Sequence, residues 1–413
     1  MMVACHDSLG VVARTGMRFV IGGLAGLLAC GQMLLAESTP AADNAAADRL
    51  WQSFIAKYTE YSLHPLDPQV LDAKARAVLI STAGPRFRSW QPESQPTLLE
   101  MADAIMAKDG SIPKFERIEK TLTALLPQID TYGHYRYAAD VAQLNEALRQ
   151  HPGSIHLTLD QAHDGRVLCF PLSDGPAELA GVHAGAQLLA VDQRTVEGKS
   201  LDALRLAFVG PPNSPITLKI KQPQGKIEEL TVTRTDRESP IVVTSKTPLG
   251  VTVRIRRFDQ GTTELIQQQL AAYPKLGRLT MDLRGNAGGL RDEALMTAAL
   301  FFPAGTVLGK FTTKAGGQTA TDRDGVALQP DSIQILQDGR TASAAEFLIA
   351  ALKDGMPGKV TLFGKKTYGK SHSTVRVMLE GGGELAVTEA LLATASGRSW
   401  DKTGIAPDQA DTK

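Results

Sequence analysis

The spacing of apolar residues changes twice along the chain and divides it into three regions. Between about residues 41 and 150, apolar positions recur with the period of an α-helix. From about 153 to 236, short apolar strands alternate with turns, and from about 240 to 410 strands alternate with helices. The pattern predicts a helical N-terminal region, a small β-rich domain and an α/β core with crossover connections.

The predicted elements are bounded by turns that contain glycine, proline or short polar residues. In the helical region, helices are expected at 48–58, 69–81, 96–107 and 118–126. In the β-rich region, strands are expected at 166–170, 187–191, 216–221 and 229–234, with a helix at 200–208. In the α/β region, strands are expected at 249–255, 278–283 and 332–336, and helices at 261–270, 291–300 and 344–352.

The first 36 residues have the pattern of an export signal. Arg14 and Arg18 precede an apolar run at 19–28, and the pattern ends near residue 36. We therefore expect residues 1–36 to be removed and the mature chain to be exported, to the periplasm or beyond. Residues 27–30 also loosely resemble a lipobox, so the alternative is a lipidated Cys30 that associates the protein with a membrane.

Composition excludes several classes of function. The 413 residues include 44 basic and 44 acidic side chains, and no Lys/Arg cluster interleaved with aromatics predicts nucleic-acid binding. No metal or cofactor is expected, because metal-ligand spacings and glycine-rich phosphate loops are both missing from the sequence. Cys169 would be the one cysteine of a chain cleaved after residue 36, so it is expected to be an inert buried thiol.

A serine and a lysine in the α/β region suggest hydrolytic chemistry. Ser343 lies between the predicted strand 332–336 and the predicted helix 344–352, where free backbone N–H groups can hold an oxyanion. Lys370 ends the sequence Thr-Tyr-Gly-Lys at 367–370. Taken singly, such a serine is more often only a helix N-cap and such a lysine only a solvated charge.

Five motifs in a fixed order favour a catalytic role for Ser343 and Lys370. They are the β-rich stretch from Gly175 to Asp192, DLRGNAGG at 282–289, TASAAE at 341–346, TYGK at 367–370 and GIAPD at 404–408. The first resembles the PDZ domain pattern. Together, from about residue 130 to the end, they resemble the carboxy-terminal processing (tail-specific) proteases of peptidase family S41. The resemblance implies a ClpP/crotonase-like α/β protease core, preceded by a helical N-terminal region and a PDZ domain.

The resemblance also implies roles for individual residues. Ser343 would be the nucleophile and Lys370 the general base, with the backbone N–H groups of Gly288 and Ala344 as oxyanion donors. The domains would be a signal peptide at 1–36, a helical region at 37–152, a PDZ domain at 153–236 and a serine protease core at 237–413. The implied partners are protein or peptide substrates with extended C-terminal segments, and an adaptor protein or a second copy of the chain remains open.

A lysine base must be neutral to accept the serine proton, although its ordinary pKa is ~10.4. We therefore expect apolar surroundings for Lys370 without a carboxylate partner. The side chains expected to form these apolar surroundings are Val360, Leu362, Phe363, Val375 and Val377.

The sequence departs from the family pattern at two places. Family members commonly carry a glutamine four residues after the lysine, where this chain has Thr374. Either Thr374, Ser373 or His372 orients Lys370 instead, or the dyad works without an orienting residue. The stretch 153–157, where the PDZ pattern expects a glycine-rich carboxylate loop, is degenerate. The alternative function is therefore a weakly active or inactive peptide-binding scaffold. The aromatic stretch 132–137 is either a packed junction or part of a binding surface.

Overall fold

The computed structural model describes residues 40–90, 94–151, 153–161, 165–172, 174–236, 240–273, 275–321 and 328–410. The expected export signal and Cys30 lie outside these residues. Within them, none of the helices is both long and apolar enough to cross a membrane.

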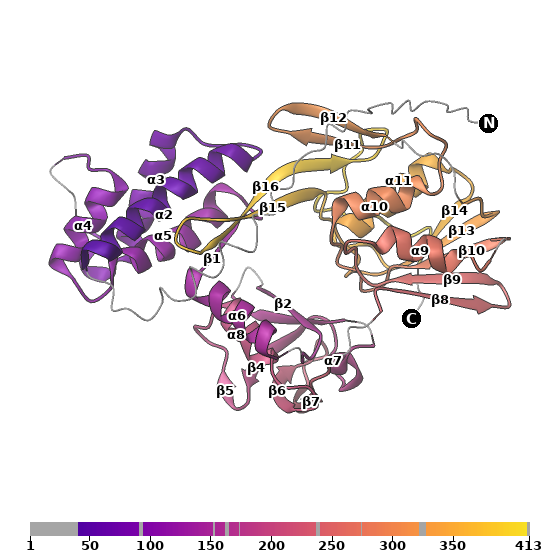
Figure 1. Ribbon diagram of the computed structural model, residues 1–413, viewed down its shortest axis with the longest axis horizontal. Coiled ribbons are helices and arrows are strands. Elements are labelled where there is room, and N and C mark those ends of the chain that lie inside the picture. The colour runs from indigo at the N-terminus through magenta and orange to yellow at the C-terminus, as the bar shows by residue number, and fades with distance from the viewer. Residues whose placement is uncertain are drawn as a thin grey trace, which may run out of the picture.

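The N-terminal region is helical and is drawn in indigo and purple in Figure 1, where its last helix, α6, lies apart from the others beside α8 (Leu201–Phe208) of the β-rich domain. The helices of the N-terminal region are α2 (Pro40–Tyr61), α3 (Pro68–Thr82), η1 (Pro85–Phe87), α4 (Leu98–Lys108), α5 (Lys114–Ile129) and α6 (Ala138–Gln150). Side-chain caps fix the predicted starts of two of them, because Asp67 accepts from Gln69 N–H before α3 and Thr97 forms a capping box with Glu100 in α4.

The α/β core is built on a six-stranded sheet in the order β17-β14-β13-β10-β9-β8. Its strands are β8 (Val242–Thr247), β9 (Gly250–Ile255), β10 (Arg278–Asp282), β13 (Ser332–Gln337), β14 (Val360–Gly364) and β17 (Gln409–Ala410). All neighbours pair in parallel except β8 with β9. The crossover helices are α9 (Thr262–Leu270), α10 (Arg291–Ala299) and α11 (Ala344–Gly355), which confirms the α/β elements expected in this region.

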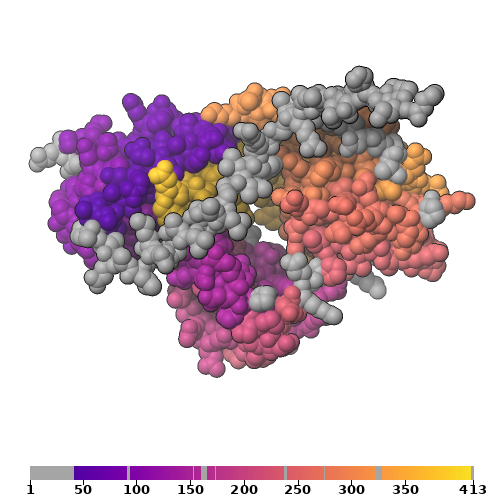
Figure 2. All heavy atoms as spheres, viewed as in Figure 1, coloured from indigo at the N-terminus to yellow at the C-terminus, as the bar shows by residue number. Residues whose placement is uncertain are grey.

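A second sheet joins distant parts of the chain and was not anticipated as a unit. It contains β1 (His134–Arg136), β11 (Val307–Thr313), β12 (Gly316–Thr321), β15 (His372–Met378) and β16 (Glu384–Ala393). β1 comes from the N-terminal region and pairs with β16. The far end of the β15–β16 hairpin packs Leu379, Leu385 and Val387 into the helical core, and Figure 2 shows its yellow atoms among the indigo and purple ones.

The β-rich domain has the sheet order β2-β3-β4-β6-β7, with β5 beside β4. Its elements are β2 (Leu157–Gln161), β3 (Val167–Pro171), α7 (Pro176–Leu179), β4 (Ala186–Val191), β5 (Arg194–Thr195), α8 (Leu201–Phe208), β6 (Pro215–Lys221) and β7 (Ile227–Thr233). Two strands of this domain were not predicted from the sequence: β2, which begins at the last residue of the degenerate stretch 153–157, and the two-residue β5. Cys169 is fully buried in this domain, and burial raises the pKa of its thiol to about 12, so the thiol is inert at neutral pH.

Ion pairs connect the β-rich domain to both other regions. Arg136 in β1 donates to Asp202 of α8 at 2.5 Å and to Glu384 of β16 at 2.9 Å. At the other side, Asp174 pairs with Arg254 and Arg256, at and just beyond the end of β9. Asp202 is only 5% exposed, so this carboxylate depends on its arginine partners for the hydrogen bonds that water would otherwise supply.

Candidate active site

The loops after four parallel strands meet at one edge of the core sheet. β9, β10, β13 and β14 all end at this edge, because parallel strands bring their carboxyl ends together. Ala342 N–H donates to Asn286 O at 2.9 Å, which joins the serine loop to the glycine turn. Tyr368 N–H donates to Thr341 O at 3.0 Å, which joins the lysine loop to the serine loop. The sequence motifs that carry Ser343, Gly288 and Lys370 are thus brought together.

Two carboxylates hold the glycine turn in shape. Asp338 Oδ1, at the end of β13, accepts Gly285 N–H at 3.0 Å and Thr341 N–H at 3.1 Å. Asp282, at the end of β10, binds the Arg284 side chain through both carboxylate oxygens, at 2.9 and 2.8 Å. Burial raises the pKa of Asp282, but the Arg284 hydrogen bonds and charge outweigh it and hold that pKa below its usual range.

Ser343 has an unusual backbone conformation, with φ 56° and ψ −117°. A non-glycine residue in such a region costs on the order of 1–3 kcal/mol and persists only where its surroundings enforce it. One hydrogen bond and the start of a helix hold this conformation. Ser343 N–H donates to Glu346 Oε2 at 2.9 Å, and α11 begins at the next residue, Ala344. The side chain remains partly exposed, as a nucleophile requires.

The predicted oxyanion donors lie beside Ser343, but only one of them is available. Ala344 N–H, at the first turn of α11, has no acceptor among the described residues. Gly288, with φ 103°, lies so close that an added methyl group would be 2.9 Å from Ser343 Cβ and 3.0 Å from Ala344 N. Its own N–H, however, donates to Asn286 Oδ1 at 2.8 Å.

The prediction for Gly288 therefore needs a correction for this conformation. Asn286 is fully buried, and its Nδ2 is anchored to Ile255 O at 2.9 Å, so its Oδ1 is held in place facing Gly288 N–H. A short polar side chain commonly binds the backbone two residues further on, which closes this kind of turn. Gly288 N–H can serve an oxyanion only after it leaves Asn286 Oδ1.

Glu346 is a central site residue that the sequence reasoning did not single out. Its carboxylate is fully buried and accepts four hydrogen bonds. The donors are Ser343 N–H at 2.9 Å, Lys370 N–H at 2.8 Å, Gly369 N–H at 2.7 Å and Thr367 Oγ1 at 2.5 Å. One side chain thus fixes the backbones of both predicted dyad residues. Its position three residues after Ser343, typical of a capping box, was the available sequence signal.

Lys370 is half-buried, and residues near the C-terminus also hold its backbone, in addition to Glu346. Trp400 Nε1 donates to Lys370 O at 3.3 Å. Gly369, with φ 96°, packs against the backbone of Gly404, so the final GIAPD motif supports the lysine loop.

Four of the five apolar side chains expected around Lys370 belong to two different hydrophobic cores. Val360 and Leu362 lie in the core beneath the sheet, but Val375 and Val377 pack against the helical N-terminal core instead. The carboxylate of Glu346 accepts the backbone N–H of Lys370 and not its amine, so the expectation that the amine lacks a carboxylate partner stays a prediction. The contacts described for Lys370 are those of its backbone, to Glu346 and Trp400.

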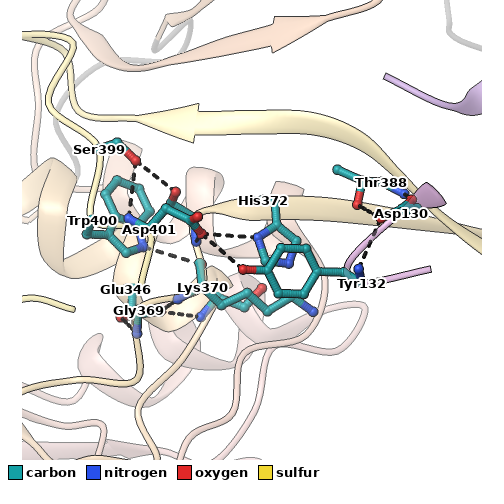
Figure 3. A network of polar contacts seen from close by, with 12 residues as sticks. Asp130, Tyr132, Glu346, Gly369, Lys370, His372, Thr388, Ser399, Trp400 and Asp401 are labelled. Atoms are coloured by element: carbon teal, nitrogen blue, oxygen red, sulfur yellow. Dashed lines mark hydrogen bonds and ion pairs between the residues drawn. The ribbon is translucent and has the colours of Figure 1, made fainter. Parts of the chain in front are cut away.

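A polar and aromatic network surrounds the residues that follow Lys370 (Figure 3). The His372 ring stacks on Tyr132 with a centroid distance of 3.3 Å. His372 Nδ1 lies 3.4 Å from Asp401 Oδ1, and Tyr132 Oη donates to the same oxygen at 3.5 Å. Burial, together with the charge of Lys370, lowers the pKa of His372 to about 4, so the ring is neutral at pH 7.

Thr374 is not part of this network. It is half-buried on β15, opposite Thr388 of β16, and its hydroxyl makes no hydrogen bond to the described residues. Ser373 Oγ donates to Glu389 at 2.8 Å. Of the three residues expected to orient Lys370, His372 alone lies in the network next to the lysine in Figure 3.

Comparison with known proteins identifies the class to which the core belongs. Residues 251–410 match the model of peptidase family S41. This segment runs from β9 to β17 and contains Ser343, Lys370, Glu346 and the glycine turn, so the chain carries a peptidase family S41 domain.

Relatives extend the similarity upstream. A probable CtpA-like serine protease of Staphylococcus aureus (strain COL) is 28% identical over 283 residues, which cover 68% of this chain and 56% of the relative. A carboxyl-terminal-processing protease of Synechocystis sp. is 30% identical over 247 residues, covering 58% of this chain and 57% of the relative. The chain thus spans little more than half the length of these relatives.

One solved structure shows that the fold is shared over most of the chain. The photosystem II D1 C-terminal processing protease aligns with a TM-score of 0.65 at 22% identity, covering 90% of this chain and 93% of that one. This alignment includes far more than the family segment, so the arrangement of helices and sheets is common to both proteins.

Proposed function

We propose that the protein is a serine endopeptidase that cleaves unstructured or C-terminal protein segments with Ser343 and Lys370. The observation that carries the proposal is the constrained serine. Ser343 is held at φ 56° before the first turn of α11, beside an unbonded N–H and tied to the Lys370 backbone through Glu346. A structural N-cap would not need this strain.

The chemistry assigned to the pair is acyl transfer. Neutral Lys370 takes the proton from Ser343 Oγ while that oxygen forms a bond to the substrate carbonyl carbon. The tetrahedral oxyanion is held by Ala344 N–H and by Gly288 N–H once the latter has left Asn286. Lys370 then gives its proton to the leaving amine, and water hydrolyses the acyl-enzyme by the reverse sequence of proton transfers.

We further propose that residues 153–236 act as a PDZ domain that binds the substrate segment as an added strand. The support is that β2 lies at the edge of its sheet and is flanked by α8. Arg205 of α8 donates to Leu159 O of β2 at 3.2 Å, on a carbonyl that an added strand would use. A bound peptide must therefore displace Arg205, and Arg205→Met should bind a C-terminal peptide more tightly than the parent in a titration by fluorescence anisotropy.

Export to the periplasm is proposed from the sequence of residues 1–36. Fractionation of cells that express the full chain, with detection of the mature N-terminus by mass spectrometry, tests it. Cleavage near residue 36 supports a soluble exported form, whereas an acylated N-terminal Cys30 would replace it with a lipoprotein.

The central test is incubation with an unfolded protein substrate and analysis of the products by mass spectrometry. Ser343→Ala and Lys370→Ala should each abolish cleavage, and Ser245→Ala, an exposed serine on β8, is the matched control. Equal cleavage by Ser343→Ala and the parent would refute the proposal.

One observation favours the alternative of an inactive peptide-binding scaffold. Gly288 N–H is engaged by Asn286, so the oxyanion site is incomplete in this conformation. A fluorophosphonate probe separates the two functions, because it should label Ser343 only if the serine can be activated. Failure to label in the presence of a bound C-terminal peptide would support the scaffold.

A further inference from the structure

His372 carries a buried polar atom that no described residue satisfies. Its side chain is fully buried, and Nε2 has no hydrogen-bond partner. An unsatisfied buried acceptor or donor costs about 1–3 kcal/mol, so such an atom calls for a functional explanation. His372 follows Lys370 by two residues, at the first position of β15.

The tautomer of His372 follows from its surroundings. Nδ1 lies 3.4 Å from the carboxylate oxygen Oδ1 of Asp401, which can only accept, so Nδ1 carries the hydrogen of the neutral ring. Nε2 then has a lone pair and needs a donor. Two neighbours fix the ring in this orientation: Tyr132 stacks on its face, and Tyr132 Oη shares the Asp401 oxygen.

The groups facing the ring leave the amine of Lys370 as the donor. Charged and titratable groups near His372 are Tyr132 and Asp130 from the N-terminal region, Asp401 from the C-terminal turn, and Lys370 on its own segment. Asp130 is occupied by Thr388, at 2.6 and 2.8 Å, and Tyr132 Oη by Asp401. Lys370 precedes His372 by two residues, and Figure 3 shows its side chain passing close to the His372 ring.

We propose that His372 is a positioning residue for Lys370, in place of the glutamine that Thr374 does not replace. In the working enzyme Nε2 accepts one N–H of the Lys370 amine and thereby directs the amine lone pair toward Ser343. Asp401 and Tyr132 hold the imidazole in the required tautomer and orientation. This inference rests on the proposed Ser/Lys protease function.

Two amide variants separate orientation from packing. His372→Asn reaches only the position of Nδ1, so it keeps the bond to Asp401 but offers no acceptor to Lys370. His372→Gln reaches the position of Nε2 and restores that acceptor. His64→Asn, an exposed histidine between α2 and α3, is the matched control.

The variants are compared by kcat, KM and the pH dependence of kcat/KM on a peptide substrate. His372→Asn should lower kcat by about 10²-fold with little change in KM, because it misplaces a reacting group. In His372→Asn the acidic limb of the kcat/KM profile should move to lower pH, because losing an acceptor destabilises the ammonium form of Lys370 and lowers its pKa. His372→Gln should restore most of kcat and the parent limb. Equal kcat and limbs in the Asn and Gln variants would overturn the proposal.

A second measurement does not depend on activity. In protein labelled with [ε-¹³C]lysine, Lys370→Arg identifies the Lys370 signal, whose titration is then followed in each variant by NMR. The Lys370 amine should titrate at lower pH in His372→Asn than in the parent, and at the parent pH in His372→Gln. If Ser343→Ala shows that the protein is not a serine protease, this titration still decides whether His372 contacts Lys370. An unchanged titration in His372→Asn would refute the contact.

Discussion

Replacing Glu346 with glutamine removes the charge that joins Ser343 to Lys370 while keeping the side-chain shape. In the parent, Oε2 accepts the N–H groups of Ser343 and Lys370, and Oε1 accepts Gly369 N–H and Thr367 Oγ1. A glutamine has a single oxygen. Whichever way the amide turns, its NH₂ group faces at least one backbone N–H that has no other acceptor.

The magnitude follows from the bonds that are lost. In the least unfavourable orientation, the glutamine oxygen takes the place of Oε2 and keeps the bonds from Ser343 and Lys370. Its NH₂ group takes the place of Oε1 and donates to the Thr367 hydroxyl, so only Gly369 N–H is left without an acceptor. Losing one charge-assisted bond in a fully buried site costs about 1.5–3 kcal/mol, and the remaining bonds weaken with the charge. We expect the free energy of unfolding to fall by about 3 kcal/mol.

The substitution should also lower the catalytic rate of the molecules that remain folded. The Ser343 and Lys370 backbones are both fixed by Glu346, so a shifted amide moves both reacting side chains. Misplacement of a reacting group by about 1 Å can cost about 10²-fold in rate, and we expect a loss of this size in kcat with KM nearly unchanged.

Glu293→Gln is the matched control. Glu293 is also buried, at 6% exposure, and accepts Gly261 N–H at 2.7 Å, Thr263 N–H at 3.0 Å and Thr263 Oγ1 at 2.9 Å, but it caps α9 and does not bind the serine or lysine loop. Urea unfolding should give similar losses of stability for both variants, while peptide hydrolysis falls only in Glu346→Gln. Similar kcat values for the two variants would refute the assigned role of Glu346.

Three further predictions follow from specific contacts. The pKa of His372 is about 4 in the folded protein and 6.5 when unfolded, so the neutral ring contributes stability that is complete above pH 6.5. About 3 kcal/mol of this stability is lost as the pH falls toward 4. The free energy of unfolding in urea should therefore depend less on pH in His372→Asn than in His64→Asn. Gly288→Ala should lower peptide hydrolysis by more than about 10²-fold, because the methyl group would meet Ser343 and Ala342 O at 2.9 Å, whereas Gly305→Ala, with a similar φ and open space around it, should keep the parent rate. Arg136→Met should destabilise the fold by about 2 kcal/mol in thermal unfolding through loss of Asp202 and Glu384, whereas Arg149→Met, which breaks an exposed pair, should stay within about 0.5 kcal/mol of the parent.

Local pattern was sufficient for the elements that surround Ser343. The strand predicted at 332–336 and the helix predicted at 344–352 are β13 and the first part of α11, because both bury continuous apolar faces in one core. Their junction places Ser343 where the sequence predicted it. The glycine turn could also be placed, but the acceptor of Gly288 N–H could not, because Asn286 competes with an oxyanion for the same donor and sequence does not say which one holds it.

Contacts between distant segments could not be read from local pattern. β1 is only three residues long and pairs with β16, far along the chain, so no hydrophobic periodicity predicts it. The sequence alone therefore does not decide whether the aromatic stretch at 132–137 is a junction or a binding surface. In the structure, Tyr132 stacks on His372 and Tyr135 lies in the helical core, so the stretch is a junction whose first member reaches the site.

The β15–β16 hairpin explains why the site depends on more than the family segment. β15 starts at His372 beside the lysine loop, and the far end of the hairpin is buried among the N-terminal helices through Leu379 and Leu385. Glu384, at the start of β16, is bound by Arg136, which also binds Asp202 of the β-rich domain. Strand pairing cannot slip by one residue without turning each buried side chain to the opposite face. The hairpin is therefore a fixed structural link from the lysine loop to both other regions.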